Sequence, residues 1–190
     1  MLGLQDKKVM ILIAPEGFRD EEFSQTHAAL KGAKADIMVV STRTGVCHGT
    51  LGSVAHAHML LDDAVNVKRD CLVLVGGAGA AIYIDDKRVE AIARQVAEDG
   101  KVLAAICLAP VILSHAGLLD GVAATVYPAP NNEEDLLAHG ADLRKSAVVE
   151  GKNNINGAPV ITANGPEAAF AFGLTLTNTL RGPVSNPWDL

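Results

Sequence analysis

The chain has 190 residues, of which 49% are hydrophobic and 20% are charged, and its formal net charge is -6. This length and composition fit one compact domain with a sizeable core, which we place at residues 1–182, followed by a C-terminal tail at 183–190. The acidic balance argues against nucleic-acid partners, because binding to a phosphate backbone needs clustered Lys and Arg.

The first half of the chain alternates apolar runs with amphipathic stretches. Val9–Ala14 is a short, wholly apolar run, which predicts a strand buried on both faces. The run is too short for a signal peptide or a membrane span. Three acidic residues then open a helix predicted from residue 20 to about 31, since carboxylates favour a helix N-terminus. Residues 36–41 predict a second strand, and the glycine-containing segment 45–58 predicts a hairpin or an irregular excursion.

The second half repeats this alternation. Cys71–Val75 is an apolar run closed by two glycines, and residues 89–100 have the apolar spacing of an amphipathic helix that ends at a glycine. Further strands are predicted at 102–106, 122–126, 147–150 and 160–163, and further helices at 108–116 and 167–180. Strands and helices of these lengths predict an α/β doubly wound sandwich with a mostly parallel central sheet.

Cys107 lies directly between a predicted strand and the helix that follows it. Functional sites in such sheets lie at the carboxyl ends of strands. A sulfur at this turn would face the free N–H groups of the helix and the positive end of its dipole, which favours the thiolate. The turn is similar to a nucleophile elbow, in which the N–H after the nucleophile, here that of Leu108, helps to bind an oxyanion. Gly77, at the end of a neighbouring strand, could supply a second donor.

The cysteines and glycines also have structural interpretations. Free cysteine is among the most buried residue types, so Cys107 could be an inert core residue, and a Gly-Gly pair most often forms a tight turn. We expect Cys71 to be inert core and Cys47 to be exposed. Three cysteines without a CxxC pair indicate free thiols in a reduced, cytoplasmic chain.

Three separated segments favour the functional interpretation: GFRDEE at 17–22, VLVGG at 73–77 and AAICLAP at 104–110. NGPEAAFAF at 164–172 adds a fourth. In order and spacing these segments resemble the DJ-1/PfpI (ThiJ/PfpI) superfamily over nearly the whole chain. The resemblance implies a flavodoxin-like, class I glutamine amidotransferase-like fold, a reactive Cys107, and a homodimer or a higher homo-oligomer.

The resemblance also implies a glutamate that hydrogen-bonds to the cysteine sulfur from the loop after the first strand. Counted from Gly17 in the family's G-x-x-x-x-E pattern, this residue is Glu22. A carboxyl beside a thiolate resists ionising, so a protonated Glu22 could donate a hydrogen bond to the sulfur or stabilise a sulfinate. From the residues alone, Glu22 could equally be a helix N-terminal acid that interacts with the dipole.

The chain departs from the family pattern where relatives carry a base. The protease-like branch has a histidine directly after the cysteine and a glutamate four residues after the Gly-Gly pair, where this chain has Leu108 and Ala81. The DJ-1 branch has a histidine where this chain has Tyr127. Tyr127 and Gly76 complete the predicted pocket, and the tyrosine either hydrogen-bonds near the sulfur or packs at the rim.

The histidines predict no metal site. His56 and His58 would share one face of a strand, but no carboxylate completes a recognised ligand spacing. We therefore expect neither a metal nor a cofactor. His115 lies two helical turns beyond Cys107, about 12 Å away, which is too far for it to act as the base.

Together with these residues, the resemblance to the DJ-1/PfpI family implies a cysteine-dependent enzyme of the glyoxalase or deglycase type, acting on small aldehydes or their adducts. Cys107 would attack the carbonyl, Glu22 would shuttle protons, and the amides of Leu108 and Gly77 would stabilise the oxyanion. The alternative is a redox sensor or stress chaperone, in which an oxidant modifies Cys107 without turnover. A PfpI-type peptidase or amidase is the third interpretation, and the absent histidine weakens it.

Overall fold

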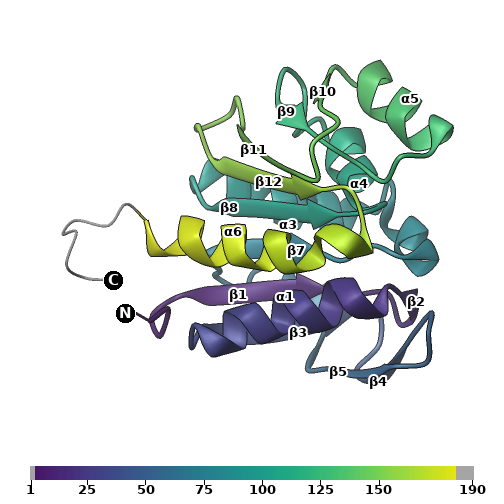
Figure 1. Cartoon of the computed structure of the whole chain (residues 1–190). Coiled ribbons are helices and arrows are strands. Elements are labelled where there is room, and N and C mark those ends of the chain that lie inside the picture. The colour runs from purple at the N-terminus through teal and green to yellow at the C-terminus, as the bar shows by residue number, and fades with distance from the viewer. Residues whose placement is uncertain (1–2, 183–190) are drawn as a thin grey trace.

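Short apolar runs form the centre of the fold, a seven-stranded sheet with the order β11-β12-β8-β7-β1-β3-β6 (Figure 1). The structure is a computed structural model that describes residues 3–182. The strands of the sheet are β1 (Lys8–Leu12), β3 (Asp36–Ser41), β6 (Met59–Leu60), β7 (Cys71–Leu74), β8 (Val102–Ile106), β11 (Val148–Lys152) and β12 (Pro159–Ala163). Neighbouring strands are parallel except for β11, which is antiparallel to β12. The predicted doubly wound, mostly parallel sheet is confirmed.

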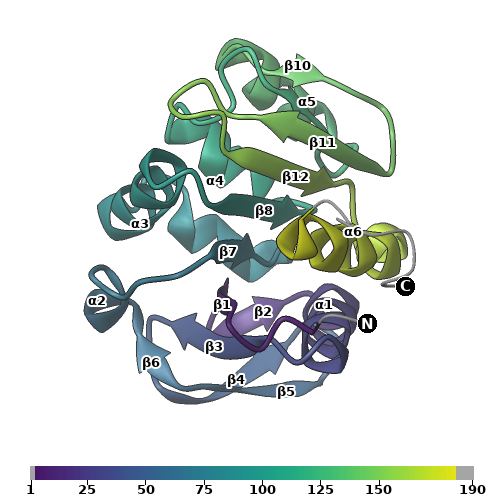
Figure 2. The same cartoon turned by 90° about the vertical axis from the view of Figure 1, so that its left-hand side faces the viewer.

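Helices cover both faces of this sheet (Figure 2). They are α1 (Asp20–Gly32), α2 (Leu61–Ala64), α3 (Lys87–Glu98), α4 (Pro110–His115), α5 (Pro130–Ala138) and α6 (Ala169–Arg181), with 3₁₀ helices η1 (Ala78–Tyr83) and η2 (Pro166–Ala168). In Figure 2, α1 and α6 lie together on one side of the sheet, and α3 and α4 lie on the other. The sheet is therefore the middle layer of three.

Alternate residues of the inner strands contact opposite helical layers. Val9 and Ile11 belong to the buried cluster that includes residues of α1 and α6. Met10 and Leu12 belong to the cluster that includes residues of α2, α3 and α4. Successive side chains of a strand point to opposite faces, so a strand buried on both faces has to be apolar throughout.

Residues 45–58 form the predicted hairpin, in which β4 (Gly45–Gly49) is antiparallel to β5 (Val54–Ala57). β4 also pairs in parallel with β2 (Glu16–Phe18), which extends the loop after β1. The expectation that Cys47 is exposed is wrong, because its side chain packs in the same buried cluster as Phe18. The hairpin thus covers core as well as facing solvent.

Two parts of the second half differ from the prediction. The strand predicted at 122–126 is shorter in the structure, where it is β9 (Ala123–Ala124). β9 pairs with β10 (Asp142–Leu143) and lies outside the central sheet, because β11 occupies the position next to β12. α5 was not predicted, since Leu136 is its one fully buried side chain and its apolar pattern is correspondingly weak.

No helix within residues 3–182 combines the length and apolarity needed to cross a membrane. The tail expected at 183–190 lies outside the described residues.

Candidate active site

Cys107 follows β8 at the carboxyl end of the sheet, in a strained backbone conformation. Its φ is +63°, in the left-handed region that residues with a Cβ rarely adopt. Its amide donates to the carbonyl of Ala163 at 2.8 Å, and its carbonyl accepts from the amide of Tyr127 at 2.9 Å. Hydrogen bonds to neighbouring segments therefore hold the elbow on both sides.

The helix after the elbow begins later than predicted. α4 starts at Pro110, and residues 107–109 form a turn in which the amide of Ala109 donates to the carbonyl of Ile106 at 3.1 Å. Proline has no N–H, and a six-residue helix has a small dipole. The sulfur of Cys107 consequently does not face the row of free helix amides that the sequence suggested.

Two backbone amides nevertheless lie close enough to the sulfur to lower the pKa of the Cys107 thiol. They belong to Gly77 and Leu108. These are the two residues that the sequence predicted as donors. Any oxygen bonded to the sulfur, or to a carbon attached to it, would lie near the same N–H groups.

Glu22 contacts the sulfur from the first turn of α1. Its side chain is 0% exposed, and its carboxyl lies against the Cys107 thiol, close enough for each group to shift the pKa of the other. Oε2 accepts from the amide of Gly76 at 3.0 Å, whereas Oε1 makes no hydrogen bond. The carboxyl that the sequence could also place at a solvated helix end is thus inside the protein, against the cysteine.

Burial determines the protonation of this pair. Desolvation raises the pKa of Glu22 to about 7, against the hydrogen bonds from Cys107 and Gly76, which lower it. Desolvation, followed by the charge of Glu22, raises the pKa of the Cys107 thiol to about 12. The lowered thiol pKa expected from the elbow alone is therefore wrong. Because the two groups touch, ionisation of one opposes ionisation of the other. The pair therefore carries at most one negative charge near neutral pH, and Glu22, the group with the lower pKa, carries it.

The Gly76-Gly77 pair allows three chain segments to meet at the sulfur. A Cβ on Gly76 would lie 2.6 Å from the Cβ of Cys107 and 2.8 Å from Oε2 of Glu22. Gly77 has a φ of +97°, and a Cβ there would lie 2.4 Å from the carbonyl oxygen of Gly17. Close packing around the site, as well as the turn itself, requires both glycines.

Tyr127 borders the site through its backbone. Its ring lies over Gly165, where an added Cβ would be 3.2 Å from Cδ2 of the ring, and its side chain is exposed. Of the two positions that the sequence left open for this tyrosine, the ring contact favours the rim of the pocket.

Arg19 is a charged neighbour that the sequence prediction missed. Its amide donates to the carbonyl of Gly76 at 3.0 Å, and its guanidinium pairs with Glu21 at 2.8 Å. The hydrogen bond to Glu21 raises the pKa of Arg19, and the charge of Glu22 adds to this effect. Arg19 lies inside the GFRDEE motif, so the sequence already placed it near the site. Its ion pair with Glu21 could not be predicted from the spacing of the residues.

All six histidines lie in the described part of the chain, and none hydrogen-bonds to Cys107 there. The contacts they make lie elsewhere: His27 is beside the ring of Phe23, His48 beside Glu16, His56 beside His58, His58 at the amide of Val39, and His115 and His139 at Asp135. A Cys–His dyad is therefore not formed within residues 3–182.

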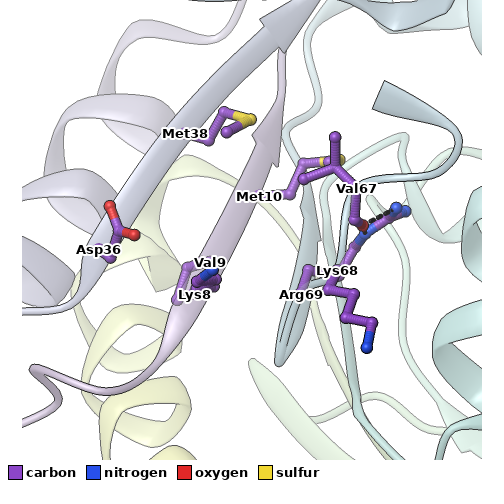
Figure 3. Close-up of a pocket in the computed structure, with 8 residues that line it drawn as sticks. All are labelled: Lys8, Val9, Met10, Asp36, Met38, Val67, Lys68 and Arg69. Atoms are coloured by element: carbon purple, nitrogen blue, oxygen red, sulfur yellow. Dashed lines mark hydrogen bonds between the residues drawn. The ribbon is translucent and has the colours of Figure 1, made fainter. Parts of the chain in front are cut away.

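A separate cavity lies at the opposite end of the sheet (Figure 3). Its lining residues are Lys8, Val9, Met10, Asp36, Met38, Val67, Lys68 and Arg69. It opens beside the amino ends of β1 and β3, where Lys8 and Asp36 are in register. Cys107 follows the carboxyl end of the parallel strand β8, so this cavity is not part of the cysteine site.

The fold and the site together define a class, the flavodoxin-like α/β proteins with a cysteine elbow and a buried glutamate against its sulfur. The model of the DJ-1/PfpI family matches residues 7–179, and the chain belongs to this family. It is 35% identical over 180 residues to an uncharacterised protein of Methanocaldococcus jannaschii, covering 94% of this chain and 85% of that protein. It is 33% identical over 143 residues to a deglycase of Pyrococcus abyssi, covering 75% and 84%.

The comparison with solved structures supports the same assignment. The DJ-1beta structure of Drosophila melanogaster superposes with a TM-score of 0.81 at 26% identity, covering 93% of this chain and 91% of that one. The predicted flavodoxin-like fold is thus confirmed.

Proposed function

We propose that this protein is a cysteine-dependent enzyme that acts on small aldehydes or their adducts, as a glyoxalase or a deglycase does. The observation that carries the proposal is the contact between the Cys107 thiol and the buried carboxyl of Glu22, whose pKa of about 7 suits proton transfer at neutral pH. The names of relatives agree with it, since they include the Pyrococcus abyssi deglycase and a glutathione-independent glyoxalase of Caenorhabditis elegans that is 24% identical to this chain.

The reaction begins with Glu22 ionised and Cys107 as the thiol, in keeping with their pKa values of about 7 and about 12. Glu22 takes the thiol proton as the sulfur adds to the aldehyde carbon and forms a C–S bond, and the carbonyl π electrons move to the oxygen. The amides of Gly77 and Leu108, which lie at the sulfur, stabilise this oxyanion until Glu22 protonates it to a hemithioacetal. Each group therefore has one role in the addition step.

With methylglyoxal as substrate, the ionised Glu22 then removes the proton from the hemithioacetal carbon. Returning a proton to the adjacent carbonyl carbon converts the hemithioacetal into a lactoyl thioester, with no external oxidant. Water hydrolyses the thioester, which releases lactate and restores the Cys107 thiol. The balance is one methylglyoxal and one water consumed for each lactate formed.

The experiment follows methylglyoxal loss and lactate formation by NMR in the wild type, Cys107→Ser and Glu22→Gln. We expect Cys107→Ser to fall to the uncatalysed rate, and Glu22→Gln to lose roughly 10²- to 10⁴-fold in kcat, the usual contribution of a positioned acid–base group. Cys47→Ala is the matched control, because Cys47 is also a buried free thiol but lies on β4. Equal aldehyde loss by the wild type and Cys107→Ser would contradict the proposal.

The second candidate function is a redox sensor or stress chaperone that uses oxidation of Cys107. Two observations favour it: no histidine hydrogen-bonds to the sulfur within residues 3–182, and Oε1 of the buried Glu22 is left without a nitrogen or oxygen partner. A protonated Glu22 would donate to a sulfinate oxygen. A protein with a similar structure, DJ-1 of Toxoplasma gondii, is described as oxidised.

Intact-mass measurement after graded peroxide separates the two functions. Addition of two oxygen atoms at Cys107 in the wild type, without lactate formation from methylglyoxal, would favour the sensor. Lactate formation that disappears in Cys107→Ser would favour the enzyme. A peptidase or amidase is the least supported function, because no Cys–His dyad is formed within the described residues.

A further inference from the structure

A second cluster of titratable side chains lies at the far end of α4 from the elbow. His115 is the last residue of α4, Asp135 is in α5, His139 follows α5, and Asp85 lies between η1 and α3. His115 Nε2 is 2.9 Å from Asp135 Oδ2, and His115 Nδ1 is 2.9 Å from Asp85 Oδ1. His139 Nδ1 is 3.3 Å from Asp135 Oδ1, and the two imidazole rings are 4.6 Å apart.

Three of these side chains can direct a ligand atom at one point. Single ligand atoms of His115, Asp135 and His139 all lie within 4.8 Å of one another. Zinc binds imidazole nitrogen and carboxylate oxygen at roughly 2.0–2.2 Å, so ligand atoms in a tetrahedral site are about 3.4 Å apart. Small side-chain rotations would bring the three atoms to these separations, because each carboxylate oxygen of Asp135 already lies near a nitrogen of one imidazole.

Asp85 is placed to orient His115 toward such an ion. A carboxylate that accepts Nδ1–H of a histidine orients Nε2 for a metal, which is the usual outer-shell arrangement of metal-binding histidines. In the metal-free protein Nε2 faces Asp135 Oδ2 at 2.9 Å, so binding of the ion would release the proton from Nε2. Asp85 is held in the left-handed region, with a φ of +61°. The turn before α3 therefore directs this carboxylate at His115 in spite of a backbone cost.

The environment of Asp135 is an independent indication of a bound cation. Its Oδ1 is buried and makes no hydrogen bond, although it lies close to Nδ1 of His139. A buried carboxylate oxygen without a hydrogen bond is unfavourable, and a bound cation would compensate it. His139 does not satisfy this oxygen, because its Nδ1 hydrogen-bonds to the backbone carbonyl of Asp135 at 2.9 Å instead.

We propose that His115, Asp135 and His139 bind zinc or a similar divalent transition metal, with Asp85 orienting His115 and water completing the coordination. The ion would join α4 to α5 and the turn before α3, and so hold together segments distant in sequence. The sequence did not reveal this site, since Asp135 and His139 share a helical i, i+4 spacing but the other two residues come from separate segments.

The test measures zinc binding to the purified full chain by calorimetry, after treatment with a chelator. We expect one zinc per chain and a rise in the thermal midpoint. His139→Ala should abolish binding, and Asp85→Asn should weaken it about 10- to 100-fold, as loss of an outer-shell partner does elsewhere. Cobalt gives a second readout, because a tetrahedral site with nitrogen and oxygen ligands produces visible absorption bands that Asp85→Asn should alter.

Two controls make the result specific. His56→Ala removes a histidine of the H-x-H pair, which lies on β5 away from the cluster, and should bind zinc like the wild type. Cys107→Ser should also bind normally, which excludes the thiol as a ligand. Absence of zinc and cobalt binding in the wild type, or equal binding in the wild type and His139→Ala, would overturn the proposal. His139 is partly exposed, so its loss should leave the metal-free protein folded.

Discussion

The carboxyl of Glu22 experiences opposing influences on its protonation. Its removal from solvent raises its pKa, whereas hydrogen bonds from Cys107 and Gly76 and the charge of Arg19 lower it. The resulting pKa of about 7 leaves both protonation states accessible near neutral pH. The same residue can therefore transfer protons in an aldehyde reaction or donate to an oxidised sulfur.

This raised pKa predicts a pH-dependent effect of Glu22→Gln on stability. The folded pKa of about 7 exceeds the reference value of 4.5, so the folded state binds more protons between these values and wild-type stability falls as pH rises through them. Below about pH 4.5 the carboxyl is protonated in both states and carries no penalty. Above pH 7 the penalty is complete, at most about 3 kcal/mol.

Urea unfolding of both proteins between pH 4 and pH 8 checks this expectation. The free energy of unfolding of Glu22→Gln, minus that of the wild type, should increase across the interval and level off above pH 7. Glu21→Gln is the matched control, since Glu21 precedes Glu22 in α1 but is partly exposed and paired with Arg19. A difference between Glu22→Gln and the wild type that does not vary with pH would contradict the raised pKa.

The family resemblance, rather than residue types alone, predicted that Glu22 lies beside Cys107, and neither predicted the electrostatics of the pair. The structure does bring these two residues, which are far apart in the sequence, close together. The direction of the thiol pKa was wrong because it depends on desolvation by packed segments and on where α4 begins. Pro110 signalled the later start, since proline favours the first turn of a helix.

The junction between β7 and η1 shows how backbone elements position the site. Gly77 is packed against the loop after β1, with a Cβ position only 2.4 Å from the carbonyl oxygen of Gly17. Its amide also lies near the Cys107 sulfur and lowers the pKa of the thiol. Displacement of this junction would therefore change the donor geometry at the sulfur together with the packing of the loop.

Gly77→Ala and Gly52→Ala form a matched pair for testing this packing. Gly77 has a φ of +97° and Gly52 a φ of +94°, but a Cβ on Gly52 would meet open space. Both variants should lose about 1 kcal/mol for placing alanine in the left-handed region, and Gly77→Ala should lose roughly a further 1–3 kcal/mol from overpacking. Chemical denaturation measures both losses, and equal losses would show that the loop yields without cost.

Element prediction succeeded where apolar periodicity was strong. The apolar run after residue 8 became β1, and the amphipathic pattern after residue 86 became α3. It made β9 too long and missed α5, two elements that contact the rest of the protein through few buried side chains. Short peripheral elements depend on tertiary contacts, and local sequence carries little information about those contacts.

At the scale of the whole molecule, the two helical layers have different relations to the cysteine site. α1 carries Glu22 and packs against α6 so closely that a Cβ on Gly173 would lie 3.0 Å from the Cβ of Ala29. Cys107 belongs to the buried cluster of this α1–α6 layer. The opposite layer contains α4 and the proposed metal cluster.

Alternating apolar runs predicted both layers, whereas strand order and the antiparallel β11 follow from long-range pairing.

The position of α6 against the sheet makes a final prediction about stability. Phe172 is 0% exposed and belongs to the core between α6 and the sheet, whereas Phe170, on the same helix, is 70% exposed. Phe172→Ala should lower the free energy of unfolding by about 3–5 kcal/mol, because it removes buried apolar surface and leaves a cavity. Phe170→Ala should change it by less than about 0.5 kcal/mol.

Thermal or urea unfolding measures the stability of both variants. Each kcal/mol shifts the thermal midpoint of a domain of this size by roughly 2–4 °C, so the midpoints of the two variants should differ clearly. Similar losses in both would mean that the outer face of α6 is covered in solution, as the homo-oligomer expected from the family resemblance would allow.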